Sequence, residues 1–224
     1  KRIKISSEVK RIGVPVGIVD KANDTVRVEF LKTIELLRGE GYEMVDVQLP
    51  FMPYSLAVYY ILMPAESSTN LSRFDGIRFG YRNESDTLLE TYLQSRGVGF
   101  GKEVQKRILL GTYVLSHGYF DAFYNKALKV QKAIKKEFEE VFKNVDVIVT
   151  PTTPSGAFKF GEKSDDPVSM YLCDIFAVPA NIAGIPAISV PKGLDENNMP
   201  LGIQFMAPMW GENRLLNTGR SLEH

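Results

Sequence analysis

The sequence contains few of the residues on which disulfides, metal sites and histidine catalysis depend. Among its 224 residues there is one cysteine, Cys173, and there are two histidines, His117 and His224. A single cysteine excludes an intramolecular disulfide and a cysteine-based metal cluster. Two histidines argue against a histidine-rich metal site and against most histidine-dependent catalytic triads. We therefore expect no metal site, and we interpret Cys173 as a small, buried apolar residue.

The sequence also lacks an excess of charge and a long apolar run. Its 27 basic and 27 acidic side chains give a formal net charge of zero at pH 7. Nucleic acid held by bulk electrostatics needs a clear basic excess, so this class of binding is disfavoured. No apolar run approaches the roughly 18 residues that span a membrane, and no signal-peptide core opens the sequence. We expect a soluble, cytoplasmic protein without a membrane partner.

Several well-known motifs of nucleotide-binding and hydrolytic sites are missing. The sequence contains no G-x-S-x-G elbow, no Walker loop, no G-x-G-x-x-G and no H-E-x-x-H. The glycine-dense residues 97–101 follow no predicted strand and have no lysine placed to hold a phosphate, which favours a flexible turn. Ser67 and Ser68 have no evident general base nearby, so capping or packing is the simpler interpretation of both.

The composition is that of a folded protein with one large domain or two small ones. Hydrophobic residues make up 44% of the chain, enough to fill the core of a globule of this length. Residues 1–10 are rich in basic side chains and show no periodic pattern of hydrophobic residues. We interpret this segment as a solvated arm or a cut end.

The N-terminal pattern predicts a strand, a helix and a second strand. Residues 11–15 are typical of a short strand ended by Pro15. A helix is expected over residues 25–38, capped by Asn23 or Asp24 and ended by glycine. Residues 43–49 alternate apolar and polar side chains, as a half-buried strand does. Such a unit implies parallel strands with a right-handed crossover.

The middle of the sequence is predicted to be helical. Residues 53–70 indicate a helix that is interrupted at Pro64, and residues 103–116 indicate another. The clearest helix spans residues 119–142, whose apolar stripe consists of Phe120, Phe123, Ala127, Val130, Ile134, Phe138 and Val141. Its opposite face carries Lys129, Lys132, Lys136 and Glu140, which we interpret as a solvated surface.

The last third of the sequence is predicted to contain further strands and one helix. Residues 146–149 indicate a short buried strand, and residues 167–183 indicate a helix. Strands are expected at residues 187–190 and 202–206, with a loop at residues 195–198 between them. Taken together, the predicted helices and strands indicate an α/β fold in which helices flank a mixed sheet.

Several longer residue strings form a recognisable pattern, in order along the chain. They are residues 65–80, 99–104, 107–112, 118–122, 150–154, 165–167, 170–171, 174–175, 179–181 and 184–191. These strings resemble the A-type subunit of the tRNA-dependent amidotransferases, which belongs to the amidase signature family. The resemblance extends from residue 11 to residue 216. Residues 179–191 match a stretch that amidase signature enzymes share widely, whereas residues 67–80 are more specific to the tRNA-dependent enzymes.

The resemblance implies that residues 11–224 form the C-terminal part of the amidase signature fold. Enzymes of this family use a lysine, a bridging serine and a nucleophilic serine inside a Gly/Ser-rich motif. No Gly-Gly-Ser-Ser-Gly-Gly string occurs here, and the family places these residues upstream of the matching region. We therefore expect a partial domain with no catalytic residue of its own, inactive in isolation.

The resemblance also implies a role in binding glutamine. Glutamine would be hydrolysed to supply ammonia, which converts Glu-tRNA(Gln) or Asp-tRNA(Asn) into Gln-tRNA or Asn-tRNA. Arg107 would pair with the substrate α-carboxylate, Asp174 with its α-ammonium group, and Tyr59 would line the pocket. Expected partners are the B and C type subunits and, through the complex, aminoacyl-tRNA. ATP and Mg would be used on a partner subunit, with no cofactor bound by this chain.

Other interpretations remain open at the level of sequence. Arg107 and Asp174 are also compatible with ordinary surface or interhelix ion pairs. The chain could be part of an amidase that acts without tRNA, or a non-catalytic module for ligand binding or assembly. The opposite charges of Arg107 and Asp174 favour a free amino acid over a simple amide, because they complement the two ends of a zwitterion.

Overall fold

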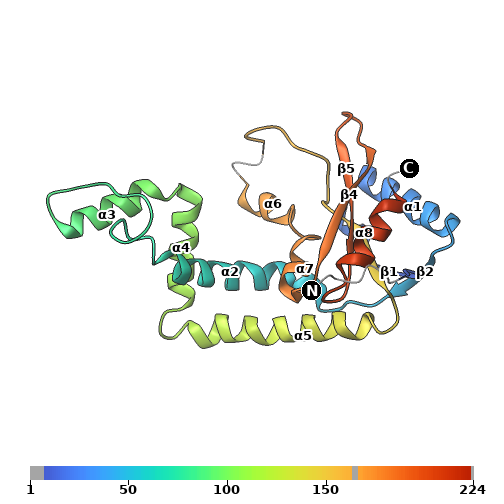
Figure 1. Ribbon diagram of the computed structural model, residues 1–224, viewed down its shortest axis with the longest axis horizontal. Helices are drawn as coiled ribbons and strands as arrows, with labels where there is room; N and C mark the ends of the chain where they lie inside the picture. The colour runs from blue at the N-terminus through green and yellow to red at the C-terminus, as the bar shows by residue number, and fades with distance from the viewer. Residues whose placement is uncertain (1–7, 163–165, 223–224) are drawn as a thin grey trace. The chain divides into compact units, whose positions relative to one another are not determined.

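The computed structural model describes residues 8–162 and 166–222, which divide into two compact units. Within the described residues, the sheet unit combines residues 8–56 with residues 131–162 and 166–222, and the helical unit consists of residues 57–130. Most of the arm predicted for residues 1–10 lies outside the described residues, so that interpretation stays a prediction. Figure 1 shows the sheet and its flanking helices in the sheet unit.

The sheet unit is built on a mixed sheet. Within the described residues it has five strands in the order β2-β1-β3-β5-β4. Strand β1 (Arg11–Pro15) runs parallel to both β2 (Glu43–Val47) and β3 (Val147–Pro151). Strand β5 (Pro200–Met206) is antiparallel to β3 and to β4 (Ala187–Leu194). The predicted fold class, a mixed sheet flanked by helices, is confirmed.

Helices α1 (Asp24–Gly39) and α8 (Glu212–Ser221) contribute to one hydrophobic core with the sheet. Of the two predicted caps, Asn23 is the one that caps α1, since its side chain accepts a 2.9 Å hydrogen bond from the Val26 N–H. Helix α8 was not predicted. Fully burying an aliphatic or phenyl side chain contributes about 1.5–3 kcal/mol. The buried members of this core are Ile12, Phe30, Ile34, Leu37, Val147, Val149, Val190, Ile203, Phe205, Ala207, Leu215 and Leu222.

The helical unit contains most of α2 (Ser55–Leu71), together with α3 (Leu88–Gly99) and α4 (Lys102–Val114). The prediction that Pro64 interrupts α2 is wrong, because the helix continues through it. Proline removes one N–H donor from the helical ladder. Pro64 and Ala65 are nevertheless buried, and Gly111 of α4 packs directly against their backbone. This packing offsets the lost hydrogen bond.

The prediction of one helix over residues 119–142 is also corrected. A π-helical segment, Phe120–Asn125, precedes α5 (Lys126–Val141). A π-helical turn is wider than 3.6 residues, so the apolar stripe does not continue through it. Phe120 and Phe123 are 39% and 42% exposed, whereas Ile134 and Phe138 are buried. The lysine-rich face of α5 is exposed, as predicted.

Two short helices replace the single helix predicted over residues 167–183. Helix α6 (Pro167–Leu172) and helix α7 (Val178–Ala183) are separated by a turn at residues 173–177. Pro179 lies in the first turn of α7, where its missing N–H costs least. Within a single long helix, Pro179 would instead break a hydrogen bond. Cys173, in this turn, is half-buried rather than buried, and its Sγ lies 3.4 Å from the Ser169 carbonyl oxygen.

The glycine-dense stretch is not simply a turn. Helix α3, which was not predicted, begins after Thr87, whose hydroxyl accepts a hydrogen bond from the Glu90 N–H. Gly97 and Gly99 lie at the C-terminal end of α3, and Gly101 caps the start of α4. The hydroxyl of Ser67 donates to the sulfur of Met63, and that of Ser68 donates to the Ala65 carbonyl oxygen, both within α2.

Candidate functional site

Arg107 lies at the middle of α4, and an acid on the same helix orients it. Its Nε donates to Glu103 Oε1 at 2.9 Å, an i,i+4 pair one helical turn apart. Its Nη1 contacts the sulfur of Met63, on α2, at 3.8 Å. The Arg107 side chain is 36% exposed. These contacts leave further N–H donors of the guanidinium fork for a carboxylate ligand.

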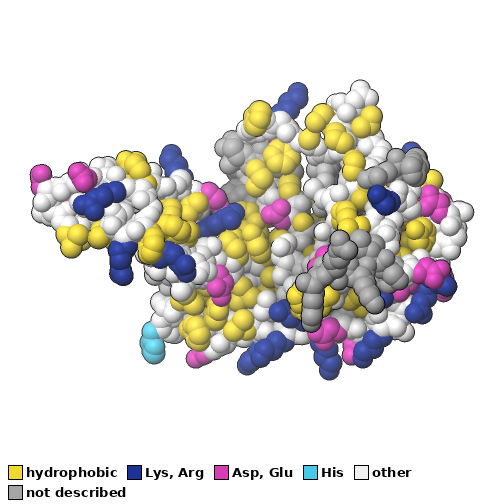
Figure 2. Space-filling model, in the orientation of Figure 1, with side chains coloured by type: hydrophobic (Ala, Val, Ile, Leu, Met, Phe, Trp, Pro, Cys, Tyr) yellow, Lys and Arg dark blue, Asp and Glu magenta, His cyan; other side chains and the backbone are white. Residues whose placement is uncertain are grey.

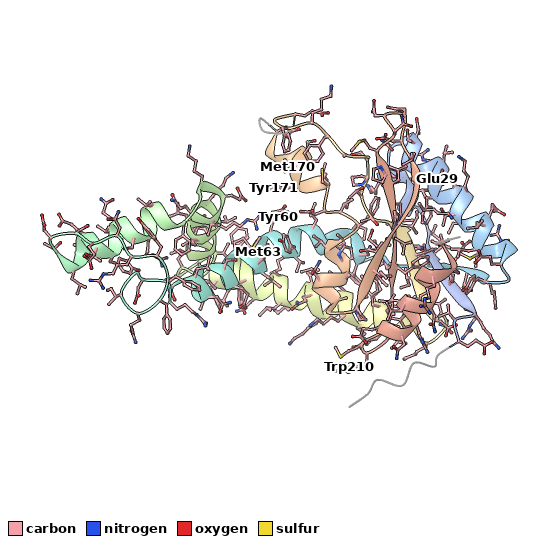
Figure 3. The ribbon with its side chains drawn as sticks, turned by 45° about the horizontal axis from the view of Figure 1, so that its top comes forward. Glu29, Tyr60, Met63, Met170, Tyr171 and Trp210 are labelled. Atoms are coloured by element: carbon pink, nitrogen blue, oxygen red, sulfur yellow. The ribbon has the colours of Figure 1, made fainter. Side chains whose placement is uncertain are left out.

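Two tyrosines of α2 extend the surroundings of Arg107. Tyr59 and Tyr60 are half-buried, and their rings meet edge to face with centroids 5.1 Å apart. Figure 3 shows Tyr60 and Met63 on the same helix. Burial works to lower the pKa of Arg107, but the hydrogen bond and charge of Glu103, together with both tyrosines, raise it. The guanidinium therefore stays fully charged at any physiological pH.

A glycine sets how closely α4 approaches α2 at this point. Gly111 lies one turn beyond Arg107, and a Cβ built there would lie 1.9 Å from the carbonyl oxygen of Pro64. No side chain larger than hydrogen fits, so the two backbones touch. Pro64 directly follows Met63, which contacts Arg107. The glycine thus brings α4 close enough for Arg107 to reach the side chains of α2.

Asp174 lies in the sheet unit, in the turn between α6 and α7. Its side chain is exposed, and its backbone carbonyl accepts hydrogen bonds from the N–H groups of Ala177 and Val178 at 3.1 and 3.0 Å. Its own N–H donates to the carbonyl oxygen of Tyr171, a residue labelled in Figure 3. Among the described residues, no hydrogen bond or ion pair is formed by its carboxylate. It is available to a cationic ligand.

The structure brings two of the three predicted binding residues together. Tyr59 and Arg107 are neighbours in the helical unit, whereas Asp174 belongs to the sheet unit. A common pocket of Arg107 and Asp174 remains a prediction. The sequence reasoning did not identify Glu103 or Met63. The spacing of Glu103, four residues before Arg107, is the signal that could have identified it.

A separate small pocket lies in the sheet unit beside the turn that carries Asp174. It follows the carboxyl ends of β1 and β2 and has a volume of about 80 Å³. Sites for small molecules occupy roughly 300–1,000 Å³, so this pocket is too small for a complete substrate. Its lining is Pro15, Val16, Gly17, Ile18, Lys21, Leu49, Met52, Pro53, Ile175 and Phe176.

The described residues show neither a metal cluster nor a membrane span. Within residues 8–162 and 166–222, no group of three His, Cys, Asp or Glu side chains could hold a metal ion. Across the same residues, no helix is both long and apolar enough to cross a membrane.

Comparison with known proteins gives one family match. A family model described as Amidase matches residues 1–216. The chain is 49% identical to the A-type subunit of glutamyl-tRNA(Gln) amidotransferase from Pelagibacter ubique, over 96% of this chain and 44% of that protein. It is 52% identical to the protein of the same name from Halothermothrix orenii, over 94% of this chain and 45% of the relative. The chain thus spans less than half the length of these curated relatives.

Solved structures agree with the sequence comparison. The crystal structure of the A-type glutamyl-tRNA(Gln) amidotransferase subunit from Thermotoga maritima aligns with a TM-score of 0.74 at 36% identity. The alignment covers all of this chain and 45% of that one. A crystal structure of an amidase aligns with a TM-score of 0.73 at 21% identity, covering 97% of this chain and 46% of the other. At that identity the second likeness shows the fold alone.

Proposed function

The chain belongs to the Amidase family, and on this premise we propose that it is part of the glutaminase subunit of a tRNA-dependent amidotransferase. The observation that carries the proposal is the 49–52% identity to proteins of that name over nearly the whole chain. The complete subunit would hydrolyse glutamine to glutamate and ammonia. The ammonia would convert Glu-tRNA(Gln) or Asp-tRNA(Asn) to Gln-tRNA or Asn-tRNA.

The role of this segment would be to hold the amino-acid end of glutamine. The Arg107 guanidinium, oriented by Glu103, would bind the α-carboxylate through paired N–H donors. The exposed Asp174 carboxylate would bind the α-ammonium group, and Tyr59 would line the pocket beside Arg107. With both ends held, the side-chain amide would be presented to a nucleophile outside this segment. Orientation of this kind lowers the barrier by avoiding the entropy cost of an unguided encounter.

The isolated 224-residue chain would not hydrolyse glutamine. It contains no Gly-Gly-Ser-Ser-Gly-Gly string that could supply the nucleophilic and bridging serines. Partner subunits would provide the site for ATP and Mg and would bring the aminoacyl-tRNA. Exposed leucines of the helical unit are compatible with such partners: Leu88, Leu89 and Leu109 are 70%, 66% and 71% exposed. Figure 2 shows hydrophobic side chains at the surface.

The amino-acid clamp is tested by Arg107→Ala and Asp174→Ala in the complete subunit, assembled with its partners. A buried hydrogen bond to a charged group is worth about 1.5–3 kcal/mol, so each variant should raise the KM for glutamine roughly 10- to 150-fold. Ammonia needs no clamp, so ammonia-driven transamidation should persist. Lys106→Ala and Asp46→Ala remove exposed charges elsewhere and serve as matched controls.

Each outcome of this experiment separates the open interpretations. Equal loss of glutamine- and ammonia-driven activity would assign Arg107 and Asp174 to folding or assembly. A normal KM in both variants would contradict the clamp. Calorimetry and a glutaminase assay on the isolated chain complete the test. Turnover there would contradict the proposed inactivity, and binding without turnover would agree with a segment that captures the substrate.

A further inference from the structure

The turn that carries Asp174 is anchored to the sheet by one buried amide. Gln204 lies on β5 and is 5% exposed. Its Nε2 donates to the carbonyl oxygen of Phe176 at 2.8 Å and to the hydroxyl of Thr150 at 3.0 Å. Thr150 is fully buried and lies directly opposite Gln204 in the register of β3 and β5. Both hydrogens of the amide are therefore engaged.

Phe176 connects this amide to Asp174, two residues earlier in the same turn. Its side chain is fully buried and packs in a cluster with Ala22, Val26 and Leu201. Its carbonyl group is the one that Gln204 holds. Asp174 lies at the exposed end of the turn, so a change at Phe176 moves the backbone that carries the carboxylate. The buried side chain of Phe176 and the hydrogen bond to its carbonyl oxygen together hold the turn against the sheet.

Gln204 is a polar residue at a core position, where a polar side chain has a free-energy cost. The neighbouring residues of β5, Ile203, Phe205 and Met206, are buried and apolar, and an apolar side chain at position 204 would also fill the core. Burying an amide costs free energy unless its hydrogen bonds are satisfied. A fully satisfied buried network makes the structure rigid and specifies one geometry. The geometry specified here is that of the turn at residues 173–177.

We infer that Gln204 is a positioning residue for the substrate-binding carboxylate of Asp174. The inference rests on the proposed function, since it assigns Asp174 to glutamine binding. Gln204 itself would not touch the substrate. Its amide would hold Phe176, and Phe176 would hold Asp174 at the distance and angle that the α-ammonium group requires.

The test uses Gln204→Met in the complete subunit, assembled with its partners. Methionine keeps the length of the side chain and removes both N–H donors. We expect the KM for glutamine to rise at least fivefold, while kcat/KM for ammonia changes less than twofold. Thr33→Val is the matched control, because it removes a buried hydroxyl bonded within α1, away from the turn. It should leave the KM for glutamine unchanged.

A double variant separates positioning from general destabilisation. If Gln204 acts through Asp174, then Gln204→Met combined with Asp174→Asn should have the same KM as Asp174→Asn alone. Independent, additive effects would overturn the inference, as would equal loss of glutamine- and ammonia-driven activity in Gln204→Met. Should Gln204→Met not fold, Gln204→Asn takes its place with the same expectations, because its shorter amide falls short of the Phe176 carbonyl.

The same measurements distinguish failure of the inference from failure of the proposed function. If Asp174→Asn leaves the KM for glutamine unchanged, the clamp is wrong and the inference falls with it. If Asp174→Asn raises the KM and Gln204→Met does not, the clamp stands and only the positioning role is overturned.

Discussion

Replacing Gly111 by alanine tests how α4 carries Arg107 to α2. The new Cβ would lie 1.9 Å from the Pro64 carbonyl oxygen and 2.4 Å from its carbonyl carbon. Non-bonded carbon atoms have their optimal separation at about 3.5 Å, so α4 must move away from α2 by roughly 1.5 Å. The clashing atoms belong to the backbone of α2, which cannot relieve the contact by rotating as a flexible side chain can. Overpacking of this kind costs about 1–3 kcal/mol, against a helix-propensity gain near 1 kcal/mol.

The expected result is a destabilised chain with a weakened site. Urea unfolding followed by circular dichroism should show a net loss of up to about 2 kcal/mol. In the complete enzyme the KM for glutamine should rise between about 10- and 100-fold, because a displacement near 1 Å can cost two orders of magnitude. The Arg107–Met63 contact, now 3.8 Å, would be lost.

A second helical glycine provides the control. Gly97, in α3, has no atom within 4 Å of the position its Cβ would take. Gly97→Ala should therefore stabilise the chain by about 0.5–1 kcal/mol and leave the KM unchanged. A Gly111→Ala variant that is as stable as the wild type and binds glutamine normally would refute the argument about helix approach.

Two further predictions concern charged groups. Partial burial opposes the charge of Asp146, but the N–H groups of Arg11 and Lys10 and the charge of Arg214 outweigh it and lower its pKa. Its stabilising contribution, about 1.5 kcal/mol, is therefore present above the ordinary Asp pKa and lost as pH falls through the lowered folded value. The difference in unfolding free energy between wild type and Asp146→Asn should vanish in acid, and a constant difference from pH 7 to pH 2 would contradict this. Glu103→Gln should change stability by less than about 0.5 kcal/mol, because the pair with Arg107 is solvent-exposed, yet raise the KM for glutamine about two- to fivefold. Tighter glutamine binding in that variant would show that Glu103 competes with the substrate.

Local signals in the sequence were sufficient for the sheet unit's first elements. The strand at residues 11–15 and the helix that follows it both appear in the structure as predicted, and Asn23 is the one of the two candidate residues that caps the helix. Strands β4 and β5 were also predicted, with ends that differ by a few residues. These elements follow from periodicity, capping and turn residues, each of which acts over a few positions.

Where long-range packing competes with local preference, the sequence reasoning failed. Pro64 stays inside α2 because Gly111, 47 positions later, packs on its backbone. The helix predicted over residues 167–183 divides, and its turn is held by Gln204 from another strand. The π-helical segment Phe120–Asn125 removes two phenylalanines from an otherwise regular stripe. Gly111 and Gln204 are both distant in sequence from the segments that they contact.

The sequence by itself determined the α/β class, the likeness to the A-type amidotransferase subunit, plus the candidacy of Tyr59, Arg107 and Asp174. These depend on residue types and on order along the chain, which a sequence contains in full. Only the tertiary structure decided that Glu103 and Met63 contact Arg107, and that Gln204 holds the turn of Asp174. The physical reason is that hydrogen bonds and close contacts act over about 3–4 Å, and folding alone determines which distant residues come within that range.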